Sequence, residues 1–368
     1  MDSVMEMARI VRRVSPRSKT ILGCFAANAF SAFYPEEAQR EFFDYVLRGD
    51  GVQFFRELCG DPLGVPITQH WLPKCGNALP WLDPHPGGQG AFVVSALGCS
   101  HGCDFCTTTA HFDNRRVPIS TPQQIVEDIK FLYRQNPNLQ NIFLQEEDQD
   151  KETLDEIGQL LREEFPHDQV ELFVVISIST LARWENLDDF AANHVTSLFI
   201  GMESKYAPEQ GYSKREGDPI QIVRGLHKRG IATFMGMVLG FDFHTRENLR
   251  EDLEFYCHLE PTGTQITLLT PHPGTPLYER LQEEGRISDF KWEDVSFFGG
   301  GHVPKNFYFH ELLNWIEWGQ ENLYQTWGPT VMRQLRLELQ AYEYFKNHSD
   351  PRLREERARL HRRKAIAL

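Results

Sequence analysis

The sequence predicts an α/β protein whose main body is a partial, TIM-like (β/α)6 barrel, with an incomplete Rossmann-like segment before it and a helical region after it. Two observations predict this fold. Short β-branched or aromatic runs alternate with helical patterns, which is typical of repeated parallel βα units. Six such runs are present, too few for a closed eight-stranded barrel. Their residue ranges are 91–97, 141–145, 171–177, 196–201, 231–239 and 264–270.

Helix start and stop signals lie between these runs. Segment 120–122 reads Ser-Thr-Pro, a capping residue followed by a first-turn proline, and segment 218–219 reads Asp-Pro with the same effect. Gly230 then supplies a helix stop before the fifth run. Because chemistry in such barrels gathers at the carboxyl ends of the strands, functional residues are expected there.

Composition along the chain divides it into four parts. Residues 1–62 form a short α/β segment, and residues 63–90 are a linker rich in proline and glycine. The barrel is predicted over 91–285, and residues 286–368 turn aromatic-rich and helical.

Charge and hydropathy restrict the class of protein. A formal net charge of -14 disfavours nucleic acid as a partner, because phosphates would be repelled. One basic segment, residues 351–368, holds seven Arg or Lys against two Glu and is predicted to be a solvated helix. With no apolar stretch of the roughly 18 residues that a membrane span needs, and no secretory signal at the start, the sequence predicts a cytoplasmic protein.

The strongest motif is C-x3-C-x2-C, formed by Cys99, Cys103 and Cys106 directly after the first predicted strand. Three thiolates in one tight loop can bind three corners of a 4Fe-4S cubane and leave the fourth iron without a protein ligand. Such an iron can chelate the methionine amino and carboxylate groups of S-adenosylmethionine. The remaining cysteines are isolated and are interpreted as small buried hydrophobes. They are Cys24, Cys59, Cys75 and Cys257.

Two other metal sites are compatible with these residues. A structural zinc site would take His101 or His111 as its fourth ligand, although zinc sites usually show paired motifs and this one has no second half. A ferredoxin would need a fourth nearby cysteine.

With an aromatic residue, Phe105, just before its third cysteine, the motif resembles that of the radical S-adenosylmethionine (radical SAM) superfamily. The resemblance extends to about Ile287 and is closest to the branch with an N-terminal cobalamin-binding domain. It implies that Phe105 contacts the cofactor. It also implies that Glu146 or Glu147, after the second strand, binds the methionine ammonium and that Glu203, after the fourth, faces the cofactor. A solvated acidic run is the competing interpretation of residues 146–156.

Two loops also resemble this branch. Asp242 stands where relatives have proline in a Gly-Phe-Pro turn, which predicts a turn of different shape. Segment 271–278 resembles a Pro-x-Pro-Gly-Thr-Pro element and is predicted to be a rigid loop over the barrel mouth. Within it, His272 is interpreted as a structural histidine, with substrate contact or proton transfer as the alternative.

Residues 17–59 resemble only the last part of a cobalamin-binding domain. They offer two strands, whereas a nucleotide-type domain needs about five to build its ligand crevice. A D-x-H-x-x-G match at residues 83–88 lies in the linker and is interpreted as chance. Cobalamin is therefore doubtful, and the chain as given is predicted not to hold it tightly.

The sequence predicts a radical SAM enzyme that uses a 4Fe-4S cluster and S-adenosylmethionine to start radical chemistry on a small molecule. The resemblance implies methyl transfer or carbon-skeleton modification, with electrons from an external flavodoxin-type or ferredoxin-type donor. Two alternatives remain open. One is a cobalamin-independent radical dehydrogenase or cyclase, and the other is a non-catalytic scaffold that binds a cluster or zinc.

Overall fold

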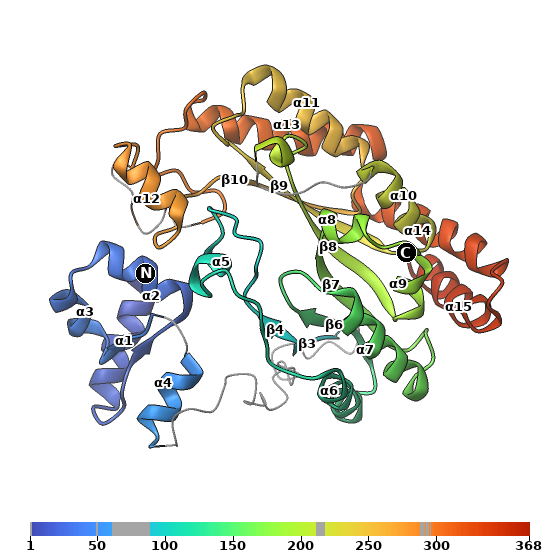
Figure 1. Ribbon diagram of the computed structural model, residues 1–368, viewed down its shortest axis with the longest axis horizontal. Coiled ribbons are helices and arrows are strands. Elements are labelled where there is room, and N and C mark those ends of the chain that lie inside the picture. The colour runs from blue at the N-terminus through green and yellow to red at the C-terminus, as the bar shows by residue number, and fades with distance from the viewer. Residues whose placement is uncertain are drawn as a thin grey trace.

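A computed structural model shows a six-stranded parallel sheet curved into an open barrel (Figure 1). The structure describes residues 2–48, 51–60, 89–210, 218–287, 291, 294 and 296–368. The strands are β3 (Gln89–Val94), β6 (Leu139–Gln145), β7 (Glu171–Ser177), β8 (Val195–Glu203), β9 (Ala232–Leu239) and β10 (Gly263–Leu268). Their order in the sheet is β10-β9-β8-β7-β6-β3, so each strand lies beside its predecessor in the chain. The barrel fold is confirmed, and each of the six predicted strands is present in the sheet, although the first ends three residues earlier than predicted.

The two faces of the sheet have different environments. In β7 the side chains of Leu172, Val174 and Ile176 are fully buried, whereas those of Phe173, Val175 and Ser177 are only partly buried. Side chains alternate across a strand, so the first set packs under the surrounding helices and the second lines the barrel interior. The covering helices are α6 (Pro122–Gln135), α7 (Lys151–Glu164), α8 (Ile178–Ala182), α9 (Asp188–Ala192), α10 (Pro219–Lys228) and α11 (Arg246–His258).

The predicted helix signals are in place. Thr121 caps α6 in a reciprocal capping box with Gln124, and Asp218 caps α10 with Pro219 at its first turn. Gly230 has a φ of +69° after α10, and a Cβ there would lie 2.1 Å from the ring of His361. Gly230 is therefore required both by its backbone conformation and by the close approach of the C-terminal helix.

The predicted strand 91–97 is broken in two. β3 ends at Val94, and β4 (Ala96–Leu97) pairs antiparallel with β5 (Val117–Pro118) instead of continuing the sheet. Ser95 lies at the break, where its N–H donates to the Gln145 carbonyl (3.1 Å) and its own carbonyl accepts from Ile119 (2.9 Å). The β4–β5 pair therefore closes the base of the segment that carries the three cysteines.

The N-terminal segment is a small α/β unit. Its helices are α1 (Asp2–Val14), α2 (Cys24–Phe33), α3 (Glu36–Phe42) and α4 (Gly51–Leu58), and its strands β1 (Ile21–Leu22) and β2 (Tyr45–Val46) run parallel. Two strands were predicted for this segment, and two short strands are present. The linker, including Cys75 and the D-x-H-x-x-G match, lies outside the described residues apart from its last two, which begin β3.

Four helices follow the barrel: α12 (Pro276–Glu283), α13 (Phe309–Trp327), α14 (Thr330–Lys346) and α15 (Pro351–Ala367). The prediction of a solvated basic helix holds for five of the seven basic residues of α15, which are exposed, but not for Arg357 and Lys364. Arg357 is fully buried and donates to the Val195 carbonyl (3.0 Å), and Lys364 pairs with Glu171 of β7 (2.6 Å). The basic residues therefore bind the amino-terminal end of the barrel, which offers carbonyls and carboxylates. Within the described residues, no helix is both long and apolar enough to cross a membrane.

Candidate functional site

The three cysteines lie in a loop at the carboxyl end of the barrel, between β4 and α5 (Thr107–His111) (Figure 1). Gly98 opens the loop with a φ of +77°, and a Cβ there would lie 2.2 Å from the Arg115 carbonyl oxygen. Only glycine fits this close approach of the two ends of the loop. All three thiols are partly exposed, and Cys106 is the residue from which α5 begins.

The thiols of this loop influence one another. Burial raises the pKa of the Cys103 thiol to about 12, and the nearby charges of Glu203, Cys106 and Cys99 act in the same direction. Burial also raises the pKa of Cys99, with Cys106 contributing. Because the pKa values of Cys99 and Cys103 are raised, these two thiols need a strongly positive group nearby to become thiolates. This donor set fits an iron-sulfur cluster, whose irons each take one cysteine.

A single zinc ion fits these residues less well. Across the described ranges, no three His, Cys, Asp or Glu side chains converge on a point where one metal ion would bind. His101, the first alternative zinc ligand, places its Nε2 2.6 Å from Asp148 instead. His111, the second, packs its ring on Phe25 of α2, with ring centroids 5.2 Å apart.

Asp148 links the cysteine loop to the sheet. This role was not predicted from the sequence. Its carboxylate binds His101 within the loop and accepts from the Ser177 N–H (2.6 Å) and the Thr180 hydroxyl (2.8 Å) at the end of β7. Burial alone would raise the pKa of Asp148, but these hydrogen bonds hold it below its usual range, and Asp148 in turn raises the pKa of His101. A histidine inside the cysteine motif was the available signal.

Glu146 and Glu147 face different surroundings. Glu146 is 1% exposed, forms an ion pair with Arg116 and accepts from the Ser95 hydroxyl (2.8 Å). Arg116 also binds Asp150 (2.8 Å), so this group holds β3, β6 and the end of the cysteine loop together. Within the described residues, the one side-chain hydrogen bond of Glu147 is a long one from Thr108 on α5 (3.4 Å), and burial raises the pKa of Glu147.

Glu203 ends β8 with an unusual backbone. Its φ is +56°, and the register with β9 shifts between Gly201 and Glu203. A Cβ on Gly201 would lie 2.9 Å from Glu203 Oε1, so the carboxylate folds back over that glycine. Burial raises the pKa of Glu203 to about 7. The structure therefore brings Glu203 towards Cys103, as its effect on that thiol indicates.

Phe105 joins the cysteine loop to the far side of the barrel mouth. Its ring lies 5.7 Å from that of Phe241, which follows β9. The neighbouring Asp104 accepts from the Leu277 N–H (3.0 Å) and pairs with Arg280 of α12 (2.6 Å). Segment 271–278 thus packs directly against the cysteine loop, and motif analysis gave no signal for Arg280.

Two other predicted residues have structural contacts. Asp242 binds Arg286 through both oxygens, at 2.7 and 2.8 Å, and so ties the segment after α12 to the barrel mouth. The His272 ring meets the edge of Phe297, with centroids 6.3 Å apart, and burial lowers its pKa.

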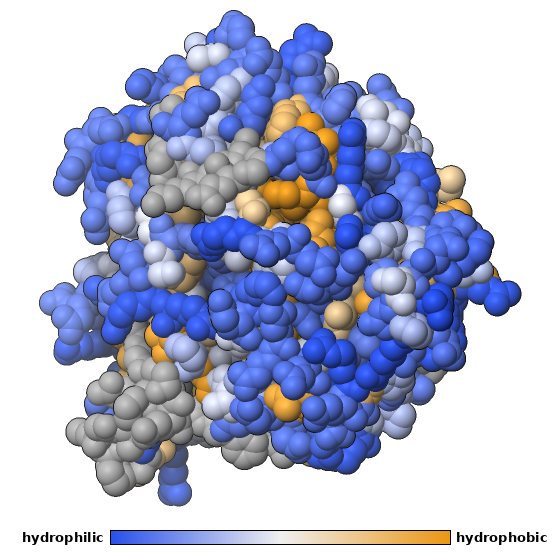
Figure 2. Space-filling view, turned by 45° about the vertical axis from the view of Figure 1, so that its right-hand side comes forward, coloured by the Kyte–Doolittle hydropathy of each residue, from blue (hydrophilic) through white to orange (hydrophobic). Residues whose placement is uncertain are grey.

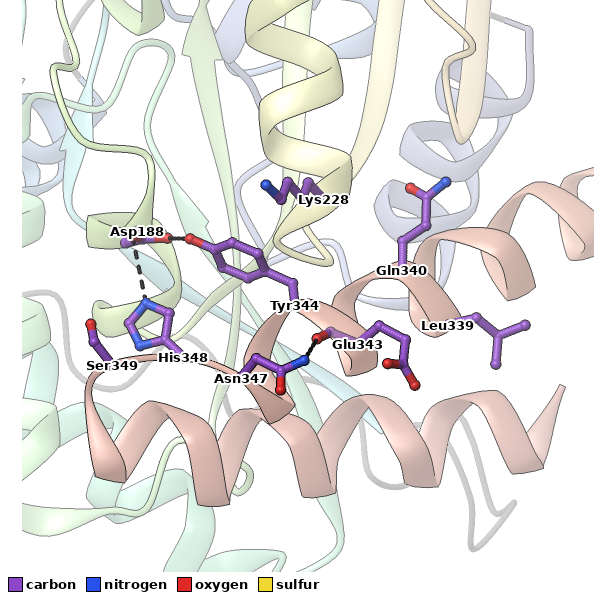
Figure 3. A pocket seen from close by; sticks show the side chains of 9 residues that line it. All are labelled: Asp188, Lys228, Leu339, Gln340, Glu343, Tyr344, Asn347, His348 and Ser349. Carbon is purple, nitrogen blue, oxygen red and sulfur yellow. Dashed lines mark hydrogen bonds and ion pairs between the residues drawn. The ribbon is translucent and has the colours of Figure 1, made fainter.

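Three cavities are relevant to ligand binding. One of about 480 Å³ borders Cys99 and His101, and one of about 370 Å³ lies between α12 and the loop after β9. The third, of about 960 Å³, is lined by Asp188, Lys228 and residues of α14 (Figure 3). Because it borders α10 on the outside of the barrel, away from the cysteine loop, it is not part of the candidate site.

Comparisons with known proteins agree with this geometry. Residues 93–256 match the family model described as the Radical SAM superfamily. A hopanoid C-2 methylase from Rhodopseudomonas palustris (strain TIE-1) is 25% identical over 241 residues, covering 63% of this chain and 44% of the methylase. An anaerobic magnesium-protoporphyrin IX monomethyl ester cyclase from Cereibacter sphaeroides is 22% identical over 210 residues, covering 55% and 34%. The chain therefore spans less than half the length of either relative.

A solved structure has a similar fold. The radical S-adenosylmethionine methyltransferase TsrM from Kitasatospora setae, with tryptophan and the analogue aza-SAM bound, matches with a TM-score of 0.55 and 16% identity, over 77% of this chain and 61% of TsrM. A partial parallel barrel with a three-cysteine loop at its carboxyl end defines a class of cluster-binding enzymes. The match over 93–256 makes this part of the chain similar to the radical SAM superfamily.

The described N-terminal segment does not fit cobalamin. α2 begins directly after β1 and lies against the barrel mouth, with Phe25 on His111. The Asn28 Cβ would lie 3.3 Å from a Cβ on Gly274, so the segment also contacts the loop after β10. A flat macrocycle between segment and barrel would have to separate these contacts.

Proposed function

We propose that this protein is a radical SAM enzyme that cleaves S-adenosylmethionine reductively and starts radical chemistry on a small organic molecule. When bound, the 4Fe-4S cluster supplies the electron that breaks a carbon-sulfur bond of S-adenosylmethionine. The observation that carries the proposal is the loop of three mutually interacting thiols, Cys99, Cys103 and Cys106, at the carboxyl end of a parallel barrel.

The cysteine loop holds the cluster. Cys99, Cys103 and Cys106 would hold the cluster through their thiolates, and an iron without a protein ligand would be available to the methionine amino and carboxylate groups. The ion pair of Asp148 with His101, together with the β4–β5 pair, keeps the loop on the end of the sheet. These contacts position the cysteine ligands.

We propose that Glu147, and not Glu146, receives the ammonium group of the methionine. Glu146 is committed to Arg116 and Ser95, and turning its buried carboxylate towards a ligand would break both interactions. Glu147 has only its long bond to Thr108, so its oxygens can accept hydrogen bonds from a ligand.

Glu203 and Phe105 complete the cofactor side of the site. The buried Glu203 carboxylate lies near Cys103, where it can accept hydrogen bonds from the ribose hydroxyls or the ammonium. Phe105, packed on Phe241, offers an apolar wall for the flat adenine ring.

The substrate and the reaction class follow from the relatives as proposals. Methyl transfer or carbon-skeleton modification of a small molecule is the main candidate, and a methylase and a cyclase are both among the similar proteins. A cobalamin-independent dehydrogenase or cyclase is the second candidate, favoured by the closed contact of α2 on α5. An external donor of the flavodoxin or ferredoxin type, in the cytoplasm, would supply the electron.

The test is 5'-deoxyadenosine release. Anaerobically reconstituted protein, reduced with dithionite and given S-adenosylmethionine, should release 5'-deoxyadenosine. The Glu147→Gln variant should need more S-adenosylmethionine for half-maximal release, by about tenfold, as expected for a lost charge-assisted hydrogen bond. No release from a protein that carries its full iron content would contradict the proposal.

A further inference from the structure

The cavity of about 370 Å³ at the barrel mouth has the composition of a ligand site. Its walls come from three places that the chain brings together at the carboxyl ends of β9 and β10. Phe241 and Phe243 follow β9, and Leu277 and Leu281 belong to α12. The remaining side is formed by Arg286, His302 and Lys305. The cavity is therefore on the same end of the barrel as the cysteine loop.

Positive charge dominates the polar part of this lining. Arg280, Arg286 and Lys305 all border the cavity, against one carboxylate, Asp242. Asp242 is bound through both oxygens to Arg286, and Arg280 pairs with Asp104. Lys305 is near enough to Asp242 to help lower the pKa of that carboxyl, but the hydrogen bonds of Asp242 go to Arg286. Because the whole chain carries a net charge of -14, a local excess of cations is a specific feature of this place.

His302 supplies a second, independent observation. It lines the same cavity and is 8% exposed, and within the described residues its Nδ1 has no hydrogen-bond partner. A buried polar atom without a partner is uncommon in folded proteins and needs a ligand or a water molecule to complete it. The neutral ring can donate one hydrogen bond or accept one.

We propose that this cavity binds the oxyanion end, a carboxylate or a phosphate, of a small organic molecule whose apolar part packs on Phe241, Phe243 and Leu281. Lys305 and His302 bind the oxyanion, and Arg280 lies between it and Asp104 of the cysteine loop. Placed here, the site anchors the anionic end of the substrate at the rim of the barrel. This role as a substrate anchor rests on the function proposed above, whereas the binding itself does not.

Binding to the purified full-length chain tests the proposal. Three probes of similar shape are titrated by calorimetry: 3-phenylpropionate, phenyl phosphate and the uncharged 3-phenylpropanamide. At least one anionic probe should bind about tenfold more tightly than the amide, as expected for charge-assisted hydrogen bonds. A preference for one anion identifies the oxyanion as carboxylate or phosphate. Equal binding of the amide, or no binding of either anion, would overturn the proposal.

Matched lysine variants locate the binding. Lys305→Gln should weaken the preferred anion about fivefold or more, and Lys305→Arg should keep its affinity within about twofold. The control is Lys228→Gln in the outer cavity, where the lysine also borders an open pocket but Asp188 and Glu343 lie nearby (Figure 3). Equal effects of the Lys305→Gln and Lys228→Gln changes would contradict a specific site. Because binding alone is measured, a failure here is distinct from a failure of S-adenosylmethionine cleavage.

Discussion

The barrel and the N-terminal segment are both parallel α/β structures, but they differ in how much structure supports them. Strands of the barrel run for six to nine residues and share one large core. Each strand of the N-terminal segment has two residues, and its core consists of six buried side chains. These are Met5, Ala8, Leu22, Phe30, Phe42 and Phe43. A unit this small buries too little surface to be stable alone.

The difference shows where the function is located. Every residue proposed to hold the cluster or S-adenosylmethionine belongs to the barrel, whereas the segment contributes contacts of α2 with α5 and with the loop near Gly274. Both contacts fall beside the cysteine loop. Figure 2 shows one face of the molecule. This face is mainly hydrophilic and has a hydrophobic area recessed in a hollow. We therefore expect the segment to cover the mouth of a barrel that already contains the site.

The largest expected effect comes from the cysteine loop. Replacing Cys99, Cys103 and Cys106 together by Ala should abolish iron binding, about four irons per chain, because no thiolate ligand remains. The control is the Cys24→Ser, Cys59→Ser double variant in the N-terminal segment, where both thiols are exposed. Iron content is measured after anaerobic reconstitution. If the control lost its iron as completely as the triple variant, the segment would have to be part of the cluster site.

The next largest effect is a difference in the free energy of unfolding between variants of two adjacent carboxylates, Glu146 and Glu147. Glu146→Gln breaks a buried ion pair with Arg116 and should lower the free energy of unfolding by about 3 kcal/mol. Glu147→Gln should change that free energy by less than about 1 kcal/mol, because its single hydrogen bond is long. Chemical denaturation of the two variants measures this. Equal losses of stability would mean that Glu147 is also a structural residue.

Acid should loosen the helices that cover the other end of the barrel. Burial lowers the pKa of His361 to about 4, so the unfolded state binds more protons below pH 6.5 and stability falls as the pH drops towards 4. Between pH 7.5 and pH 5 this histidine alone should remove about 2 kcal/mol. Glu338 accepts a hydrogen bond from His361 (2.7 Å), and Arg357 and Lys364 are close.

His361→Gln should flatten that pH dependence while keeping a donor for Glu338. Denaturation midpoints of the two proteins at pH 7.5 and pH 5 give the comparison. An unchanged slope would assign the acid sensitivity to the other buried histidines near α15, His167 and His194, whose pKa values are also lowered by burial.

The smallest effect concerns the contact between the two regions. Phe25→Ala removes the ring that packs on His111 and should cost about 1 kcal/mol, felt mainly within the N-terminal segment. Hydrogen exchange should then speed up in residues 20–46 and stay unchanged in β6 and β7. Faster exchange throughout the barrel would show that the segment supports the barrel fold as well.

The sequence predicted the barrel because its signals are local. Runs such as Glu171–Ser177 are rich in β-branched residues, and the turns between them carry capping residues and glycines. The cysteine motif has a fixed spacing, so it could also be recognised from the sequence. The break at Ser95 was not, because the signal for ending β3 is a hydrogen bond to Gln145, fifty residues away in the chain.

Contacts between distant segments explain the remaining differences. From the sequence alone, Glu146 is interpreted as part of a solvated acidic run. The fold places Arg116, thirty residues earlier in the chain, beside it. From the sequence alone, all the basic residues of α15 are interpreted as solvated. The fold gives Lys364 a partner in β7 and Arg357 a partner in β8. In each case the charge was visible in the sequence, but its partner depended on the fold.

Electron paramagnetic resonance tests whether Cys99, Cys103 and Cys106 hold a 4Fe-4S cluster that binds S-adenosylmethionine. Spectra of the reduced, anaerobically reconstituted protein are recorded with and without S-adenosylmethionine. A cluster held by three cysteines has one iron open to the cofactor. We therefore expect a 4Fe-4S signal that changes when S-adenosylmethionine is added. The signal should be absent from the triple cysteine variant. A 4Fe-4S signal that S-adenosylmethionine leaves unchanged, or stoichiometric zinc in place of iron, would contradict it.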